Sequence, residues 1–296
     1  MSKTFLYPIL VFAAGSSYGL IVPVIKSAAS GGIYPASFLP LQYLVAFLVC
    51  AAVVAARRLP LRGIGARSAL SMMALGLFTG CTSVCYYSSV SLLPSAVALT
   101  LLFQYVWVSV IIECIAKRRL PDRPSVIAVL VVLAGTLLST GIFDGSYQGL
   151  DPVGVAFGIA SALFYALFLY FSGILGAGQP ALVRTSLLAL GGLVTTTVAN
   201  PSGLFASAVA PTLWPFAAEL AFLGILFPTS LINYASPKLS ASMVSIMASS
   251  ELPVGILAAW ALVGDAPSPL ALFGCALVLA AIVYRQLPKA RKQPQP

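Results

Sequence analysis

Long apolar stretches follow one another along almost the whole chain, separated by short segments that contain glycine, proline or basic residues. A helix needs about 20 mostly apolar residues to cross roughly 30 Å of hydrocarbon, where its backbone groups must bond within the segment. The alternating pattern of a membrane barrel is absent from the sequence. The pattern therefore predicts ten membrane-spanning helices, at residues 6–25, 38–56, 69–90, 95–116, 124–143, 152–174, 183–200, 213–232, 239–262 and 269–286.

Composition supports this interpretation. Hydrophobic residues make up 60% of the 296 residues and charged residues 8%, whereas soluble domains have about 45–50% and about 25%. A chain with so little polar surface needs lipid as its main solvent. The sequence predicts an all-α polytopic membrane protein, with the lipid bilayer as a partner.

The residue types that are missing exclude several kinds of chemistry. The sequence contains no histidine, which excludes imidazole proton relays, Ser/His and Cys/His nucleophiles and histidine-ligated metals. The five cysteines lie in apolar stretches without a CxxC motif and are predicted to be packing residues. A Walker A motif is also absent. We therefore expect neither an enzyme nor a metal or other cofactor.

The net charge of +9 is distributed unevenly between the loops. Loops of one parity and the C-terminal tail hold Arg57, Arg58, Arg62, Arg67, Lys117, Arg118, Arg119, Arg123, Arg184, Lys238, Arg285, Lys289, Arg291 and Lys292. The opposite loops hold Asp144, Asp151 and Asp265, with Lys26 as their one cation. By the positive-inside rule both termini are predicted to be cytoplasmic. The charge is thus a topology signal and does not indicate nucleic acid as a partner.

The two halves of the chain resemble each other in span length and in a few aligned residues. Residues 94–140 align without gaps to 240–286 at an offset of 146, so that Pro121 falls on Pro267. Each half has five predicted spans, and an odd number places the second half upside down relative to the first. We predict a first five-helix repeat over 1–143, a linker over 144–151, a second, inverted repeat over 152–286 and a basic cytoplasmic tail over 287–296.

Three stretches resemble the drug/metabolite transporter superfamily, specifically its EamA-like members. They are LPSAVA at 93–98, SSELPV at 249–254 and GDAP at 264–267. The resemblance implies a carrier of the plasma (inner) membrane, often an exporter of small metabolites or toxic organic compounds. In related folds, spans one, three, four, six, eight and nine line the central cavity.

The sequence departs from the family pattern at one feature. EamA-like proteins often place glutamate directly before proline in the fourth and ninth helices. Here Glu251 is separated from Pro253 by Leu252, and the matching first-half segment reads Gln104-Tyr105-Val106. A role based on the Glu/Pro pair is therefore not expected in the first half.

Glu251 is the strongest candidate for substrate binding and for proton coupling. It lies about 12 residues into the predicted ninth span, or ~18 Å at a rise of 1.5 Å per residue, which is close to the middle of the bilayer. An ionisable residue at this depth usually marks a substrate or ion pathway. Because burial disfavours the charged carboxylate, Glu251 could exchange protons during a transport cycle. The alternative is a protonated carboxyl group hydrogen-bonded to a neighbouring helix.

Two further acids have less informative positions. Glu219 lies about six residues into the eighth predicted span. It is a second binding candidate, with a side chain reaching toward the outer surface as the alternative. Glu113 precedes Lys117 by four residues, an order that favours an ion pair at the cytoplasmic interface. Lys26 is expected to extend toward water or to meet a carboxylate at the outer mouth.

Aromatic and amide side chains on the expected cavity helices are further substrate-binding candidates. They are Tyr18, Tyr86, Tyr87, Gln104, Tyr105, Trp107 and Tyr165. Beside a carboxylate, aromatic faces attract an organic cation or the ammonium group of a zwitterion. The alternatives are packing or interfacial positions for the aromatic rings and hydrogen bonds between helices for Gln104.

Prolines and small residues add two expectations about the helices. Pro23, Pro228 and Pro253 should interrupt the first, eighth and ninth spans. The pairs Gly76/Gly80 and Gly154/Gly158 should allow helices to approach closely.

These features predict a secondary transporter that exports a small amphipathic metabolite or drug-like compound by alternating access, with protons as a candidate coupling ion. Two alternatives remain open from the residues. One is a facilitator or importer of amino acids or organic cations, in which Glu251 binds the substrate without coupling. The more distant one is an integral membrane enzyme that modifies lipid.

Overall fold

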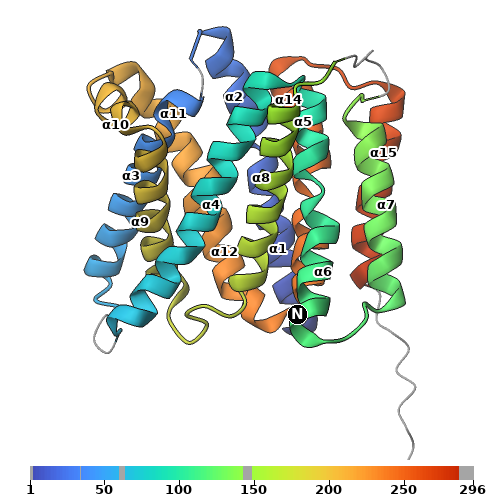
Figure 1. Ribbon diagram of the computed structural model, residues 1–296, viewed down its shortest axis with the longest axis horizontal. Helices are drawn as coiled ribbons and strands as arrows, with labels where there is room; N and C mark the ends of the chain where they lie inside the picture. The colour runs from blue at the N-terminus through green and yellow to red at the C-terminus, as the bar shows by residue number, and fades with distance from the viewer. Residues whose placement is uncertain (1–2, 34, 60–63, 143–148, 287–296) are drawn as a thin grey trace, which may run out of the picture.

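The structure is a computed structural model that describes residues 3–33, 35–59, 64–142 and 149–286, and every regular element in these ranges is a helix (Figure 1). The α-helices are α1 (Lys3–Gly19), α2 (Ile21–Ser30), α3 (Pro35–Ala56), α4 (Ala66–Leu92), α5 (Ser95–Leu102), α6 (Tyr105–Lys117), α7 (Arg123–Ser139), α8 (Pro152–Phe171), α9 (Ala181–Ala199), α10 (Pro201–Ala208), α11 (Trp214–Ala221), α12 (Phe227–Ala235), α13 (Ala241–Ala248), α14 (Glu251–Val263) and α15 (Pro269–Gln286). The prediction of an all-helical chain is confirmed for the described residues.

Nine helical segments in the described part of the chain are long and apolar enough to cross a membrane. They correspond to nine of the ten predicted spans, several of them made of two consecutive helices, such as Ser95–Lys117 and Ala241–Val263. The remaining predicted span, 124–143, is represented by the apolar helix α7, which has 17 residues. The tail 287–296 and most of the linker 144–151 lie outside the described residues.

Prolines explain where three of the segments break. Pro23 and Pro253 are each the third residue of a new helix, α2 and α14, and Pro228 is the second residue of α12. A proline ring clashes with the carbonyl four residues earlier, so the preceding helix ends or distorts there. Accordingly α1 ends at Gly19, and the residues before α12 form a π-helical segment, Phe222–Leu226.

The fourth predicted span breaks without a proline. Between α5 and α6, the backbone N–H of Gln104 donates to Leu101 O at 3.1 Å, one residue out of the α-helical register. The side-chain amide of Gln104 donates to Thr100 O at 2.9 Å and so satisfies the carbonyl that the backbone has left. Since lipid offers no hydrogen bonds to a free carbonyl, this side chain stabilises the break.

The helices stand roughly side by side, and contacts between distant segments hold them together (Figure 1). Helix α4 packs against α8 and α9, and α3 packs against α9 and α11. On the other side of the bundle, α1 contacts α12, α13 and α14. Helices α7 and α15 form a pair at one edge of the molecule. The described helices therefore form one continuous bundle.

Glycines set the closest helix–helix approach. A Cβ atom on Gly76 of α4 would lie 1.9 Å from Leu188 O and 2.5 Å from the backbone nitrogen of Gly192 in α9. Gly154 and Gly158 of α8 similarly face Leu93 and Leu101. The expectation that these pairs permit close packing is confirmed.

The position of Arg184 adds to one expectation. The sequence analysis counts it among the basic residues that set the topology, and the structure shows in addition that its side chain is fully buried. The guanidinium donates to the carbonyls of Ser172 and Asn233, which lie at the C-terminal ends of α8 and α12. Helix C-termini carry unpaired carbonyls and partial negative charge. Arg184 on α9 therefore stabilises the ends of two other helices.

The contact between α4 and α9 yields a first prediction. Gly76→Ala should lower the free energy of unfolding by about 1–3 kcal/mol, because the added methyl group forces the two backbones apart. Gly178→Ala is the matched control, since a Cβ atom there meets no atom within 4 Å. Thermal unfolding of both variants in one detergent tests this, and equal midpoints would contradict the assigned helix contact.

Candidate functional site

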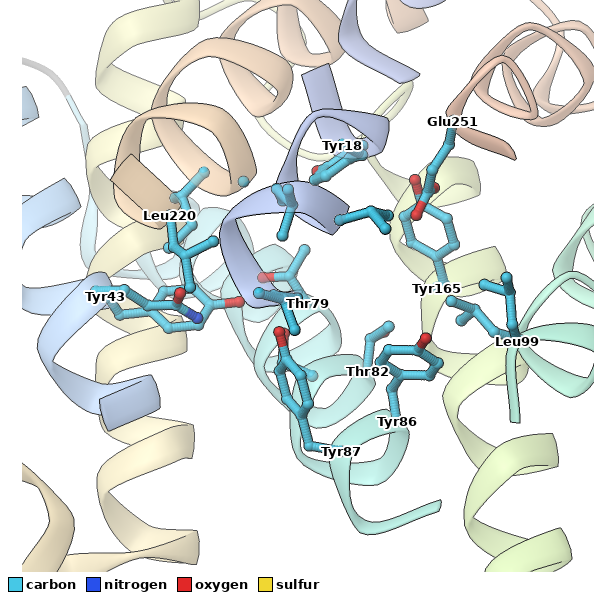
Figure 2. A pocket seen from close by; sticks show the side chains of 18 residues that line it. Tyr18, Tyr43, Thr79, Thr82, Tyr86, Tyr87, Leu99, Tyr165, Leu220 and Glu251 are labelled. Carbon is cyan, nitrogen blue, oxygen red and sulfur yellow. The ribbon is translucent and has the colours of Figure 1, made fainter. Parts of the chain in front are cut away.

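Two adjoining cavities lie within the helix bundle. The first, which we call the central cavity, has a volume of about 170 Å³ (Figure 2). It is lined by Tyr18, Ile21, Val22, Ile25, Gln42, Tyr43, Thr79, Thr82, Ser83, Tyr86, Tyr87, Leu99, Leu102, Tyr165, Leu220, Gly224, Ile225 and Glu251. The second, the vestibule, has a volume of about 480 Å³ and reaches exposed residues of the loop between α14 and α15. The vestibule therefore connects the interior with one end of the bundle.

The two cavities share one section of wall, which consists of Val22, Ile25, Tyr86, Tyr87, Leu99 and Glu251. These residues come from α2, α4, α5 and α14. A molecule at the shared wall would contact both halves of the chain. The helices that line the central cavity belong to the first, third, fourth, sixth, eighth and ninth predicted spans, as the family resemblance implies, and α3 adds Gln42 and Tyr43.

Glu251 occupies the junction of the cavities because it is the first residue after a helix break. Ser250 immediately before it donates through Oγ to Phe12 O of α1 at 2.8 Å, which fixes the break against α1. Gly19 of α1 allows close contact, since a Cβ atom there would lie 2.5 Å from Glu251 O. Figure 2 shows the Glu251 carboxyl group pointing into the cavity.

The carboxyl group of Glu251 has no cation beside it. The ion pairs of the described residues are Lys26–Asp265, Lys117–Glu113 and Arg285–Asp122, and none includes Glu251. An acid in an apolar bundle is costly unless it is protonated, paired or bound to a ligand. Glu251 is therefore a cavity-lining acid that a proton or a bound cation can neutralise.

Tyrosine rings surround much of the central cavity. Tyr18 meets Tyr165 edge-on with ring centroids 6.2 Å apart, and Tyr86 and Tyr87 lie 5.6 Å apart. Tyr43 completes the set from α3. The Tyr165 hydroxyl is buried and has no hydrogen-bond partner in the described residues. These rings present both aromatic faces and hydroxyl groups to the space beside Glu251.

A polar stripe on α4 forms another wall, and its pattern was available in the sequence. Thr79, Thr82, Ser83, Tyr86 and Tyr87 all line the central cavity. Their spacing of three and four residues places them on one face of a helix. The interpretation of the sequence took only the two tyrosines from this face, although a polar stripe along an otherwise apolar span indicates a cavity wall.

Five of the nine predicted site residues line the central cavity: Tyr18, Tyr86, Tyr87, Tyr165 and Glu251. The other four are absent from both sets of lining residues.

These four are Glu219, Gln104, Tyr105 and Trp107. Glu219 is exposed on α11. Gln104 bonds to Thr100 at the helix break and accepts a hydrogen bond from Trp107 Nε1 at 2.8 Å. Tyr105 is fully buried behind Tyr165, with ring centroids 4.5 Å apart. Gln104, Tyr105 and Trp107 all lie at or just after the break between α5 and α6, and no described residue of α6 lines either cavity.

Charged groups mark the two ends of the bundle. Lys26 of α2 forms an ion pair with Asp265, and both residues line the vestibule where it reaches the surface. At the opposite end, Glu113 pairs with Lys117 at 2.5 Å, as predicted. Glu113 also accepts a hydrogen bond from the backbone N–H of Ser242 at 2.8 Å. This second contact joins α6 to the first turn of α13 and was not evident from the sequence.

Comparisons with known proteins agree with this architecture. The EamA-like transporter family model matches residues 6–141. An uncharacterized transporter of Synechocystis sp., sll1319, is 35% identical over 92 residues, which is 30% of this chain and 27% of that protein. The match thus spans about a quarter of the relative's length.

One solved crystal structure aligns with a TM-score of 0.74 over 96% of both chains at 18% identity, and so shares the fold. The family and the relative both indicate a transporter rather than an enzyme. The first part of the chain, residues 6–141, therefore matches the EamA-like transporter family, and the shared fold extends over nearly the whole length.

Proposed function

We propose that this protein is a secondary transporter that exports small metabolites or drug-like amphipathic compounds across the plasma membrane by alternating access. The observation that carries the proposal is the position of Glu251, which lines both cavities beside a helix break and lacks a cation partner. Broken helices at membrane depth are tolerated where they line a cavity, and they form the binding sites of many transporters.

Alternating access requires two halves that can exchange conformations, and the helix packing supports such a pair. Helix α1 contacts α12, α13 and α14, while α8, the first helix of the second half, contacts α4, α5 and α6. The contact of α3 with α11 is matched by that of α9 with α4. Two inverted repeats of five spans, with the 17-residue α7 counted as one, account for this correspondence.

The helix breaks support the same relationship. The first half breaks at Gln104 and the second at Ser250, and these positions differ by the 146-residue offset of the repeat. At the next position the halves differ, with Tyr105 in one and Glu251 in the other. A single coupling acid is therefore expected, in the second half.

The orientation follows from the basic residues. Figure 1 places the C-terminal end of α3, the N-terminal end of α4 and the link from α6 to α7 at the same end as the start of α1. Arg57 directly follows α3, Arg67 lies in the first turn of α4, and Arg119 lies between α6 and α7. The positive-inside rule assigns that end to the cytoplasm. Both termini would then be cytoplasmic. The vestibule would open to the exterior, which is the state from which an exporter releases its substrate.

Closure at the cytoplasmic end would depend on Glu113. Its carboxylate accepts a hydrogen bond from Ser242 N at the start of α13, where unpaired N–H groups favour a negative charge. The contact crosses from the first half to the second. We therefore assign Glu113 as a latch that stabilises the outward-open state.

Transport itself can be tested in proteoliposomes preloaded with a mixture of amino acids, amines and aromatic carboxylates. Mass spectrometry should detect faster release of at least one component than from protein-free liposomes, and a pH gradient should accelerate it further. Glu251→Gln should reduce this acceleration about tenfold or more, because an amide cannot exchange a proton. Glu219→Gln, at an exposed acid outside both cavities, is the matched control and should behave as the parent protein.

Release that is insensitive to both the gradient and Glu251→Gln would exclude proton coupling and favour a facilitator. If no component left the liposomes faster than from controls, the carrier role would be wrong.

The orientation can be tested by labelling single cysteines in intact cells. In a cysteine-free background, Ser30→Cys at the outer end of α2 should react with a membrane-impermeant maleimide added outside. Arg119→Cys should react only after permeabilisation, because its loop is predicted to be cytoplasmic. Both positions are exposed, so access alone decides the result. The reverse labelling pattern would contradict the proposed orientation.

The latch can be tested through the exposure of α13. Glu113→Ala should raise the labelling rate of a cysteine at the buried position Ser245 about fivefold, since losing a helix-capping contact costs about 1 kcal/mol. Lys117→Ala removes the ion pair but leaves the bond to Ser242, and it should have a smaller effect. Equal rates in the two variants would assign the effect to the ion pair instead of the bond between halves.

A further inference from the structure

The described lining of the central cavity contains an acidic side chain and no basic one. Among the described residues that line it, Glu251 is the one aspartate, glutamate, lysine, arginine or histidine. The nearest lining cation of the vestibule is Lys26, whose ammonium group is already paired with Asp265. A ligand in the central cavity would therefore meet a carboxyl group with no protein cation to balance it, which favours positive charge.

The aromatic walls favour the same kind of ligand. Tyr18, Tyr43, Tyr86, Tyr87 and Tyr165 come from four different helices and face a common space. Aromatic faces attract ammonium groups, and the attraction grows when water is excluded. Tyr165 is 6% exposed, and its hydroxyl oxygen has no protein partner in the described residues. That oxygen can accept a hydrogen bond from a ligand.

A threonine of α4 adds an acceptor to the walls. Thr79 Oγ1 donates to Gly76 O at 3.2 Å, and Thr82 Oγ1 donates to Phe78 O at 2.8 Å. With its proton used within the helix, the Thr82 hydroxyl group offers lone pairs to the cavity, whereas the Thr79 hydroxyl group also bonds to the Tyr43 side chain. This wall therefore complements a ligand that carries N–H donors.

The shared wall suggests where the rest of the ligand would lie. Val22, Ile25 and Leu99 connect the central cavity, of about 170 Å³, to the vestibule, of about 480 Å³. An ammonium group at Glu251 would leave an apolar body against these three side chains. A carboxylate on the same ligand would find no unpaired lysine or arginine among the described residues that line either cavity.

We propose that the site selects organic monocations, namely protonated amines or quaternary ammonium compounds with a compact apolar body, over zwitterions and anions. This inference rests on the proposed transport function and narrows its substrate class. Glu251 balances the charge, the tyrosines contact the ammonium group, and the aliphatic wall contacts the apolar body.

Three compounds of similar size test the charge selectivity directly: phenethylamine, phenylalanine and 3-phenylpropionate. Calorimetric titration of the purified full-length protein in nanodiscs should give at least tenfold tighter binding for phenethylamine than for the other two. Glu251→Gln should weaken phenethylamine binding at least tenfold, whereas Glu219→Gln should leave it unchanged. Tighter binding of phenylalanine or phenylpropionate, or an equal loss in both variants, would overturn the proposal.

A second pair of variants keeps the test valid if Glu251→Gln fails to fold. Tyr86→Phe retains the ring and should keep the binding of benzyltrimethylammonium within about twofold, while Tyr86→Leu should weaken it about fivefold, because a cation over a ring contributes ~1 kcal/mol. Equal binding by the two variants would contradict the aromatic contribution.

The outcomes also separate this inference from the transport function. Release of phenylpropionate from proteoliposomes in preference to phenethylamine would leave the carrier role intact and overturn the cation selectivity. Binding of phenethylamine without transport of any compound would support the cation site and overturn the carrier role.

Discussion

A helix in lipid must bond every backbone group within itself or to protein, and this constraint governs the molecule. Where a helix breaks, the freed groups need another partner, so the break is fixed in place by its neighbours. Gln104 provides that partner for Thr100, and Ser250 connects the second break to Phe12 of α1. The second break positions Glu251 at the junction of the cavities. The site is thus a consequence of how the chain satisfies an interrupted helix.

The same constraint explains why small residues and an arginine carry so much of the packing. Helices in lipid gain little from hydrophobic burial against each other and associate through close contact and hydrogen bonds. Gly76 and Gly19 allow backbones to approach within the space that a methyl group would fill. Arg184 pairs with carbonyls at the ends of two helices, without a carboxylate partner among the described residues. Arg184, which the sequence analysis counts as a topology signal, therefore also joins the ends of two helices through hydrogen bonds.

Predictions from the sequence were correct where they involve residues close together in one helix. They were wrong where the position of a side chain depends on how its helix is rotated in the bundle. The apolar stretches, the proline positions and the Glu113–Lys117 pair were predictable because each involves residues within one or two helical turns. The placement of Tyr105 and Trp107 was not, because the break at Gln104 changes which face of α6 points inward. Glu219 lies outside both cavities for a related reason, since the π-helical segment after it alters the register of its span.

The sequence by itself determined the all-helical membrane class, the approximate spans, the resemblance to EamA-like transporters and the presence of an acid, Glu251, deep within a span. These follow from hydropathy, from residue order and from the cost of a carboxyl group in lipid. Only the tertiary structure decided that five tyrosines line the cavity that Glu251 enters, that Lys26 is neutralised by Asp265 and that Glu113 reaches α13. Each of these contacts joins residues from separate helices. Their proximity depends on helix rotation and depth, which no local pattern in a uniformly apolar chain records.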